Sequence, residues 1–313
     1  MNLAQKIDRE QVAAAIIASS VGPSAKEEGS RLAEAFLDNF DKYPDTQWTT
    51  VAVEQAWWML LAPKTLIVGV QDRLAYDHEG RIHGFEWKSH REPKIKKDGQ
   101  PYAGDTEDDW LQEISQDAQL RVYALAMQKA TYLDARKLGV PEPRIVVRAV
   151  IKATPAYLWP TKPETGVFTF PQPWIDSTEA ALLSAGEQIR AARKLNLLPW
   201  ALPSVHCVST KYHRTCEYLA PFCSKGLHPA PPVWTSADST DPGWKAVGAS
   251  GVDLLDPEVV VLSASSYLNW RHCPENYRIL TSGAAPGEES FALDCGSAMH
   301  VGIAAGFRQL MLK

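Results

Sequence analysis

The sequence predicts an α/β fold in which a small mixed sheet is flanked by helices. The first observation is the stretch Thr65–Ser89, TLIVGVQDRLAYDHEGRIHGFEWKS, in which apolar residues nearly alternate on either side of residues 77–80. Such alternation predicts two strands, and the polar DHEG run that ends in glycine predicts the turn between them. The second observation is another strand-like stretch at 144–155, RIVVRAVIKATP, which we expect to be central in the sheet.

The third observation is a series of stretches with helical periodicity. Between 24 and 43, for example, Leu32, Ala35, Phe36 and Phe40 recur at helical spacing while charged residues cover the other face. The stretch 48–61, WTTVAVEQAWWMLL, is ambiguous because it begins with β-branched residues and continues with helix formers. A short strand is expected at 166–174. The expected helices span 3–20, 24–43, 110–137 and 177–195, the last with Ser177 as its N-cap.

Composition sets limits on the function. The 313 residues suffice for one large domain or two ordinary ones, and no apolar run is long enough for a membrane span, so we expect a cytoplasmic protein. A formal charge of −5 argues against a general nucleic-acid coat protein, but it is compatible with an enzyme that has a local basic channel. Five cysteines in a cytoplasmic chain suggest thiols or metal ligands rather than disulfides.

Three charged residues interrupt the apolar pattern of the predicted hairpin. Asp72 lies in the first strand and Glu86 in the second, and Lys88 leaves the same face of its strand as Glu86. Burying these groups is costly unless they are paired or bind a metal. Carboxylates are hard ligands for Mg²⁺, which keeps bound waters, so the pattern suits a magnesium phosphodiesterase. The alternative is an ordinary hairpin with three exposed charges.

At these residues the sequence resembles the PD-(D/E)xK nuclease superfamily, in particular its RecB-type and phage exonuclease branch. Gly69-Val-Gln-Asp72 matches the Gly-x-x-Asp strand of that branch, Glu86-Trp-Lys88 its (Asp/Glu)-x-Lys element, and Gln119 with Tyr123 its Gln-x-x-x-Tyr helix. The order and spacing agree over roughly 29–151. The resemblance implies a restriction-endonuclease-like core and a DNA nuclease dependent on Mg²⁺ or Mn²⁺.

The resemblance also implies roles for individual residues. Asp72 and Glu86 would bind the metal with the carbonyl of Trp87, and Lys88 would orient or deprotonate a water, since the pKa of a lysine falls readily when it is desolvated beside a metal. Gln119 and Tyr123 would line the strand path, although a helix with their neighbours would also pack on a sheet without any such role. Glu54 resembles an outlying acid of the family; it is either a third ligand or a surface glutamate.

A long polar stretch, SHREPKIKKDGQPYAGDTEDDW, follows the hairpin. Its second half is acidic, and its first half is basic. The basic part could contact DNA phosphates and give salt-dependent binding. The alternative is a solvated loop of mixed charge. The predicted DNA-binding residues are Arg91, Lys94, Lys96 and Lys97.

Three cysteines cluster further along the chain, at Cys207, Cys216 and Cys223. Their spacing is not that of a zinc finger. The segment is similar to the C-terminal cysteine knot that binds a [4Fe–4S] cluster in many RecB-type nucleases, although its spacing is wider. A cluster needs a fourth ligand, for which Cys273 is the candidate. Zinc with His206 or His213, or three buried thiols, are the alternatives.

The C-terminal stretch presents a puzzle. Residues 262–279 and 292–307 resemble the opening of a RecB-type nuclease, which family members carry before the Asp strand and not after it. The matching residues are Ser263, Ser265, Cys273, Pro274, Tyr277, Gly296 and His300.

Three explanations compete: a circular permutation in which His300 completes the metal site, the start of a tandem second module, and chance. We favour the tandem interpretation, because Gly29-Ser30 already fills the helix position that His300 would duplicate. The expected organisation is a nuclease-like domain with its cysteine segment at 1–227, a Pro/Gly/Ser-rich linker at 228–257 and this segment at 258–313.

These observations predict a DNA nuclease, in the first instance an exonuclease, that acts in phage or bacterial DNA processing or recombination. Its partners would be DNA and either a recombination protein or a second copy of the chain, and a phage-encoded protein would work in the host cytoplasm. One alternative is a catalytically degenerate nucleic-acid-binding module of a recombination or CRISPR-like complex. Another is a structural protein built on a cysteine–metal site.

Overall fold

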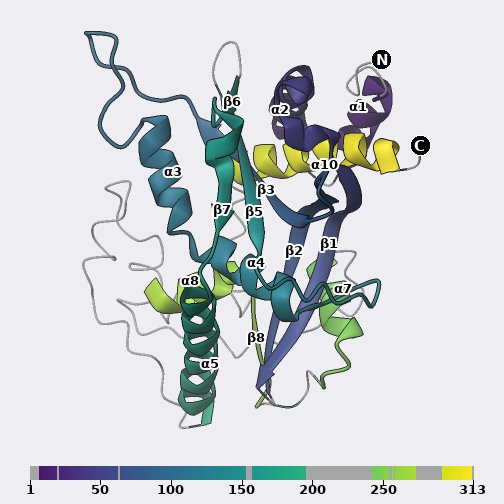
Figure 1. Cartoon of the computed structure of the whole chain (residues 1–313), viewed down its shortest axis with the longest axis vertical. Coiled ribbons are helices and arrows are strands. Elements are labelled where there is room, and N and C mark those ends of the chain that lie inside the picture. Colours follow the sequence, from purple (N-terminus) through teal and green to yellow (C-terminus); the bar gives the residue numbers. More distant parts are fainter. Residues whose placement is uncertain are drawn as a thin grey trace.

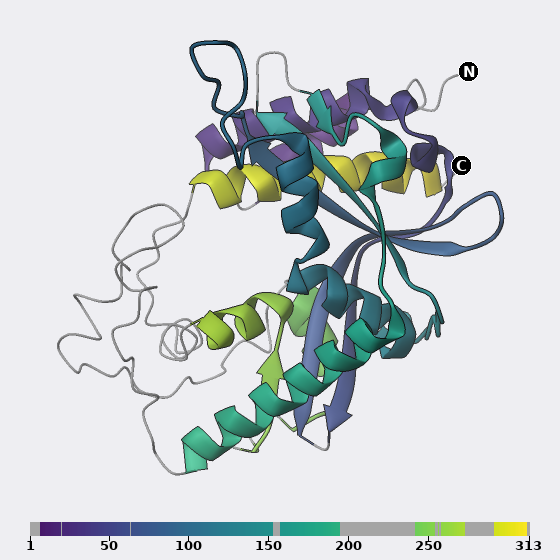
Figure 2. The same ribbon diagram turned by 60° about the vertical axis from the view of Figure 1, so that its left-hand side comes forward.

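The computed structural model describes residues 7–19, 21–62, 64–152, 157–194, 242–253, 256, 258–272 and 291–311. Within these residues a twisted mixed sheet lies between two groups of helices (Figures 1 and 2). The strands are β1 Thr49–Ala62, β2 Thr65–Tyr76, β3 Ile82–Arg91, β4 Thr131–Tyr132, β5 Arg144–Lys152, β6 Tyr157–Trp159, β7 Val167–Thr169 and β8 Val260–Leu262. The α-helices are α1 Arg9–Ala18, α2 Pro23–Asp38, α3 Glu107–Ser115, α4 Ala118–Lys129, α5 Gln172–Lys194, α7 Pro242–Ala249, α8 Ala264–His272 and α10 Phe291–Met311. Short 3₁₀ turns occupy Phe40–Lys42, Pro44–Gln47 and Pro163–Gly166.

The strand order is β4-β1-β2-β3-β5-β6, with β7 paired to β5 and β8 paired to β2. The pairs β1–β2 and β2–β3 are antiparallel, whereas β3–β5 and β2–β8 are parallel. The predicted α/β class with a mixed sheet is therefore confirmed. The stretch 144–155 contains the central strand β5, and the ambiguous stretch 48–61 forms β1.

The predicted hairpin of 65–89 is present as β2 and β3. Its turn is fixed by Asp77, whose Oδ1 accepts hydrogen bonds from the backbone N–H groups of Glu79 and Arg81, each at 2.9 Å. Gly80 has φ +76°, which a glycine adopts without steric cost. The two strands pair only from Arg73 to Tyr76 on β2 and from Ile82 to Phe85 on β3, and beyond this they diverge.

Three helices cover one face of the sheet. α10 packs against both α1 and α2 and lies over β1 and β3, and Figure 1 shows α10 beneath the other two helices at the top of the molecule. Small residues allow the close approach: a Cβ added at Gly29 of α2 would lie 2.3 Å from the Cβ of Ala298 on α10. A Cβ added at Gly302 would lie 2.8 Å from the Cβ of Ala33. Trp87 of β3 stacks on Phe307 of α10, with ring centroids 5.5 Å apart.

The other face is covered by α4, α5 and α8, which enclose the larger core. α4 is buried along most of its length, as its run of apolar residues from Leu120 to Met127 requires. Trp57 of β1 lies across Gly69, where a Cβ would come within 2.3 Å of the indole ring. The glycine of the Gly-x-x-Asp element therefore makes room for a core tryptophan.

Two predictions about helices are wrong in detail. The stretch 110–137 is not one helix: α3 ends at Ser115, α4 begins at Ala118, and β4 follows α4. Asp117 causes the break, because its side chain accepts a hydrogen bond from the Gln119 N–H at 2.8 Å and so caps a new helix. Likewise α5 begins at Gln172, so Ser177 lies inside this helix and is not its N-cap.

The C-terminal third packs on the same sheet. β8 adds to β2, α8 packs on α4 and α5, and α10 covers β1 and β3. The stretch expected as a linker contains α7, whose Val247 is buried against Leu66 and Val68. Residues 228–241 of that stretch lie outside the described residues. No helix in the described ranges is long and apolar enough to cross a membrane.

Candidate functional site

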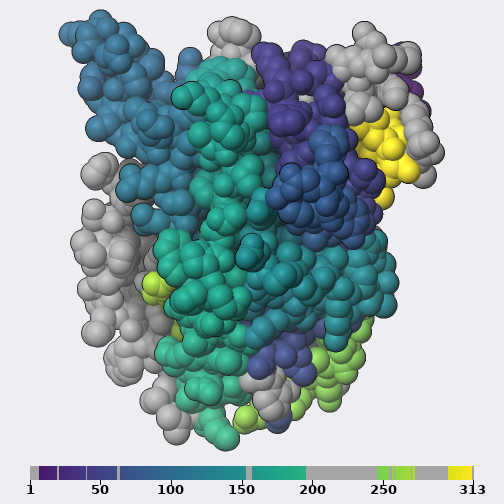
Figure 3. Space-filling model, viewed as in Figure 1, coloured from purple at the N-terminus to yellow at the C-terminus, as the bar shows by residue number. Residues whose placement is uncertain are grey.

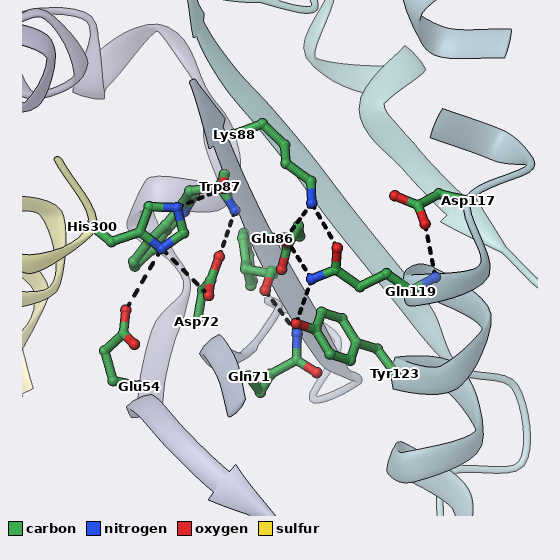
Figure 4. Close-up of polar contacts among 11 residues, drawn as sticks. Glu54, Gln71, Asp72, Glu86, Trp87, Lys88, Asp117, Gln119, Tyr123 and His300 are labelled. Carbon is green, nitrogen blue, oxygen red and sulfur yellow. Dashed lines mark hydrogen bonds and ion pairs between the residues drawn. The ribbon is translucent and has the colours of Figure 1, made fainter. Parts of the chain in front are cut away.

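The site forms where β2 and β3 diverge, and side chains replace the missing backbone pairing. Asp72 Oδ2 accepts a hydrogen bond from the backbone N–H of Trp87 at 2.7 Å. Beside it, Gln71 Nε2 donates to the carbonyl of Phe85 at 2.7 Å. Both side chains are buried, with 6% of Asp72 and none of Gln71 exposed. The gap between the strands is thus held open by two polar side chains and contains a carboxylate (Figure 4).

An acid–imidazole group lies on the α10 side of this gap. Glu54 of β1, Asp72 of β2 and His300 of α10 each place one possible ligand atom within 4.8 Å of the others. His300 Nδ1 lies 3.6 Å from Asp72 Oδ1 and 3.9 Å from Glu54 Oε1. The structure therefore brings the predicted residue His300, far away in sequence, next to Asp72 (Figure 4).

A hydrogen bond orients the His300 ring. Its Nε2 lies 2.7 Å from the carbonyl oxygen of Trp87. Because a carbonyl can only accept, Nε2 must carry the proton. In the neutral ring the lone pair is then on Nδ1, which faces the two carboxylates. This is the tautomer that a metal-binding histidine needs.

Glu54 has an unusual backbone. Its φ is +50°, which is uncommon for a residue other than glycine. It lies where the β1–β2 register passes from the pair Val53–Arg73 to the pair Gln55–Gln71. Such conformations cost about 1–3 kcal/mol and occur preferentially at functional sites.

A second chain of polar contacts lies on the α4 side. Gln119 is its centre: its Oε1 accepts from Lys88 Nζ at 2.8 Å, and its Nε2 lies 3.0 Å from Glu86 Oε1 and 2.7 Å from the Tyr123 hydroxyl. Lys88 Nζ also contacts Glu86 Oε1 at 2.6 Å. Glu86 and Lys88 therefore share a face, as expected. The predicted four-residue spacing of Gln119 and Tyr123 also places both at the site.

The site carries more buried negative charge than its partners neutralise. Burial and, next, the charge of Asp72 raise the pKa of Glu54 to about 7, and the same two causes raise the pKa of Glu86 to about 7. Glu54 Oε1 and Glu86 Oε2 are buried without a hydrogen-bond partner in the described part of the chain. Burial lowers the pKa of His300, but Asp72 and Glu54 outweigh it and raise that pKa to about 9.

The protein groups around Lys88 favour its charged form. Burial alone would lower the pKa, but the adjacent carboxylate of Glu86 outweighs it, so that the pKa is raised above its ordinary value. The expectation that the pKa of Lys88 falls beside a metal stays a prediction, because it concerns the site with the ion bound.

These residues fit a divalent cation. A metal site without its ion has three features: carboxylate oxygens with no hydrogen-bond partner, acids with raised pKa values and an imidazole oriented toward those acids. The described residues here show all three. A cation would neutralise the buried charge and take up the two free oxygens. Glu54, Asp72 and His300 form the compact group that could hold it, and Glu86 lies on the opposite side of Asp72 with one free oxygen (Figure 4).

The other predicted site residues lie elsewhere or outside the described residues. Arg91 pairs with Asp105 at 3.2 Å, and Lys94, Lys96 and Lys97 lie in the stretch between β3 and α3. The predicted iron–sulfur or zinc ligands Cys207, Cys216, Cys223 and Cys273, with His206 and His213, all lie outside the described residues. Sequence reasoning missed Gln71, although a glutamine inside an apolar strand and next to Asp72 was visible in the sequence.

Comparison with protein families agrees with this geometry. The family model described as the PD-(D/E)XK nuclease superfamily matches residues 2–218, which include every site residue except His300. Searches of curated proteins and of solved structures gave no match. The mixed sheet with flanking helices is consistent with the restriction-endonuclease-like fold of that family. Since the match covers most of the chain, the protein belongs to the PD-(D/E)XK nuclease superfamily.

Proposed function

We propose that this protein hydrolyses phosphodiester bonds of DNA with a bound divalent metal, Mg²⁺ or Mn²⁺. The observation that carries the proposal is the group of Glu54, Asp72 and His300 at the point where two strands diverge, beside the contact between Lys88 and Glu86. Membership of the nuclease superfamily supports a nucleic-acid substrate.

Asp72, Glu54 and His300 would hold the metal, with Glu86 as a further ligand. The carbonyl of Trp87, predicted as a ligand, instead accepts from His300 Nε2 on the opposite edge of the ring from Nδ1, so it orients the imidazole and does not share its metal. A metal bound there would polarise the scissile phosphate and lower the pKa of a bound water. His300 is positioned for this role by its hydrogen bond to Trp87, and Asp72 by the Trp87 N–H. A residue from α10 would in this way complete a site whose acids come from the sheet.

Lys88 would stabilise the negative charge that develops on the scissile phosphate. Its contacts with Glu86 and Gln119 aim the ammonium group at the site and keep it protonated. A cation held in this way offsets the negative charge that grows on the phosphate during attack, and it can orient a water by donating hydrogen bonds to it. Gln119 would fix both Lys88 and Glu86, and Tyr123 would fix Gln119.

We propose further that the C-terminal segment from residue 258 is a permuted part of the nuclease domain and not the start of a second one. Its support is the pairing of β8 with β2, the packing of α10 against α2 and the position of His300 beside Asp72. α10 supplies the histidine that the upstream helix α2 lacks. This weakens the main argument for a degenerate, purely binding module, which was the absence of an upstream histidine.

More specifically, we propose that the protein is an exonuclease of phage or bacterial DNA processing. This narrower proposal rests on the likeness of the 69–72 and 119–123 motifs to the phage exonuclease branch. The iron–sulfur cluster remains a prediction from the cysteines at 207, 216, 223 and 273. The visible absorption spectrum of anaerobically purified protein tests the cluster, because a [4Fe–4S] cluster is brown and zinc is colourless.

The decisive experiment follows the degradation of end-labelled linear DNA, single- and double-stranded, with and without Mg²⁺ or Mn²⁺. We expect Asp72→Ala and Lys88→Ala to lose cleavage by a factor of about 100 or more, because each removes a group that contacts the metal or the reacting phosphate. Lys137→Ala, which changes an exposed lysine far from the site, is the control. Product lengths separate exonuclease from endonuclease action, and full activity of either site variant would exclude the assignment.

A further inference from the structure

The stretch between β3 and α3 folds as a small hairpin, here called the basic hairpin and defined as residues 94–102. Lys96 N–H donates to the carbonyl of Gln100 at 2.7 Å, Tyr102 N–H donates to the carbonyl of Lys94 at 3.0 Å, and Ile95 pairs with Pro101. Gly99, with φ +82°, makes the turn. Figure 1 shows this segment extending from the body at the upper left, and Figure 3 shows it as a separate lobe.

The acidic half of the stretch is used to anchor the hairpin. Asp105, which is 8% exposed, accepts hydrogen bonds from the Arg91 side chain and from the Lys94 N–H. Glu107 accepts from the Thr161 N–H at 2.7 Å. Thr106 caps α3 by accepting from the Asp109 N–H, and the Asp109 carboxylate accepts in return from the N–H groups of Thr106 and Gly104. Asp105 and Glu107 thus tie the stretch to the body of the protein, Asp109 closes the start of α3, and Asp108 is exposed.

The basic half is left exposed. Lys94, Lys96 and Lys97 form no ion pair with any residue in the described ranges, and all three are exposed. Two large side chains on the same hairpin are exposed as well: Ile95 at 55% and Tyr102 at 50%. Lys96 Nζ lies 5.8 Å from the centre of the Tyr102 ring. The hairpin also carries one exposed acid, Asp98, at its turn, so lysines outnumber acids by three to one within residues 94–102. This excess of positive charge beside two large exposed side chains favours a binding surface over a solvated loop of balanced charge.

We propose that the basic hairpin binds single-stranded DNA next to the scissile phosphate. Lysine side chains bind the phosphates of single- and double-stranded DNA alike. Exposed apolar and aromatic groups can stack only on unpaired bases, because the base faces of a duplex are stacked inside it. Lys94, Lys96 and Lys97 would contact the backbone, and Tyr102 would stack on a base beside Ile95. This inference rests on the proposed nuclease function and names its substrate.

The hairpin is close enough to the site for this role. It follows directly on β3, the strand that bears Glu86 and Lys88, and it leads into α3 and then into α4, which bears Gln119. Lys94 is six residue steps along the chain from Lys88, so the fully extended chain between them spans at most about 20 Å. A strand bound by the hairpin would therefore have its neighbouring phosphates at the site.

The test is equilibrium binding of a fluorescent single-stranded oligothymidine and of a blunt duplex of equal length, in EDTA, over a series of salt concentrations. For the triple variant K94Q/K96Q/K97Q, we expect the slope of log affinity against log salt on single-stranded DNA to fall by about 2, since each phosphate contact contributes about 0.7. We expect Tyr102→Ser to weaken single-strand binding about 5- to 100-fold and Tyr102→Phe to restore it.

The control is the triple variant K42Q/K137Q/K245Q, which removes three exposed lysines elsewhere and should bind and cleave as the wild type does. The proposal is overturned if the hairpin variants bind single strands like the control, if Tyr102→Ser has no effect, or if wild-type protein binds the duplex as tightly as the single strand. Because binding is measured without metal, these outcomes are separate from loss of cleavage in Lys88→Ala, which tests the nuclease function itself.

Discussion

The acids of the site are destabilising charges in the absence of metal. Glu54 illustrates this best, because its Oε1 is buried without a hydrogen bond from any residue that the structure describes and its pKa is raised to about 7. An acid with a raised pKa binds its proton more tightly in the folded state, so the folded protein loses stability as the pH rises from about 4.5 through 7. Glu54→Gln should therefore stabilise the metal-free protein at pH 8 by about 1–3 kcal/mol and change its stability little at pH 4.5.

Urea unfolding in EDTA at the two pH values measures this difference. The same variant should lose metal binding, which separates the stability of the site from its function. The pKa of His300, raised to about 9, gives a change of the same sign between about pH 6.5 and 9. Glu54 is one cause of that raised pKa, so Glu54→Gln also reduces it, which offsets part of the stabilisation expected at pH 8. A Glu54→Gln effect that is equal at both pH values would show that burial and Asp72 do not raise the pKa of Glu54.

The close packing of helix α10 against helix α2 determines where His300 lies. Gly29→Ala introduces a Cβ within 2.3 Å of Ala298, so the two helices must separate. We expect the free energy of unfolding to fall by about 1–3 kcal/mol despite the higher helix propensity of alanine, and metal affinity to fall with it. Gly248→Ala is the control inside another helix, α7, because nothing lies within 4 Å of a Cβ there. Equal stability of the two variants would mean that the helix contact is not tight.

Elements defined by local patterns could be predicted from the sequence, and those defined by a single side chain could not. The hairpin of β2 and β3 has apolar residues at every second position and a turn with its own hydrogen bonds. Its two strands and the face shared by Glu86 and Lys88 could therefore be predicted from the sequence. The division between α3 and α4 depends on Asp117, which caps α4 within a continuous helical pattern. The break at Asp117 therefore escaped a prediction based on periodicity.

At the scale of the whole molecule, the site depends on contacts that no local pattern reveals. Asp72 and His300 lie far apart in the sequence. They meet in the fold because small residues on α2 and α10 let these helices pack closely. The family motif predicted that a histidine belongs near the acids. The sequence left open whether His300 completes the site, as a permuted segment would, or belongs to a tandem module, and the contact between His300 and Asp72 comes from the tertiary structure.

Metal binding should therefore stabilise the whole fold by joining the C-terminal helix to the sheet. A ligand at 100 times its dissociation constant stabilises the folded state by about 2.7 kcal/mol, so Mn²⁺ should raise the unfolding temperature of the wild type and EDTA should reverse the effect. His300→Ala should lower Mn²⁺ affinity at least about tenfold and Mg²⁺ affinity less, because imidazole is a better ligand for transition metals than for Mg²⁺. The control is His78→Ala, in the exposed turn between β2 and β3. If thermal unfolding with each ion shows the same stabilisation in His300→Ala as in the wild type, the metal is held by the sheet acids alone and α10 has no part in the site.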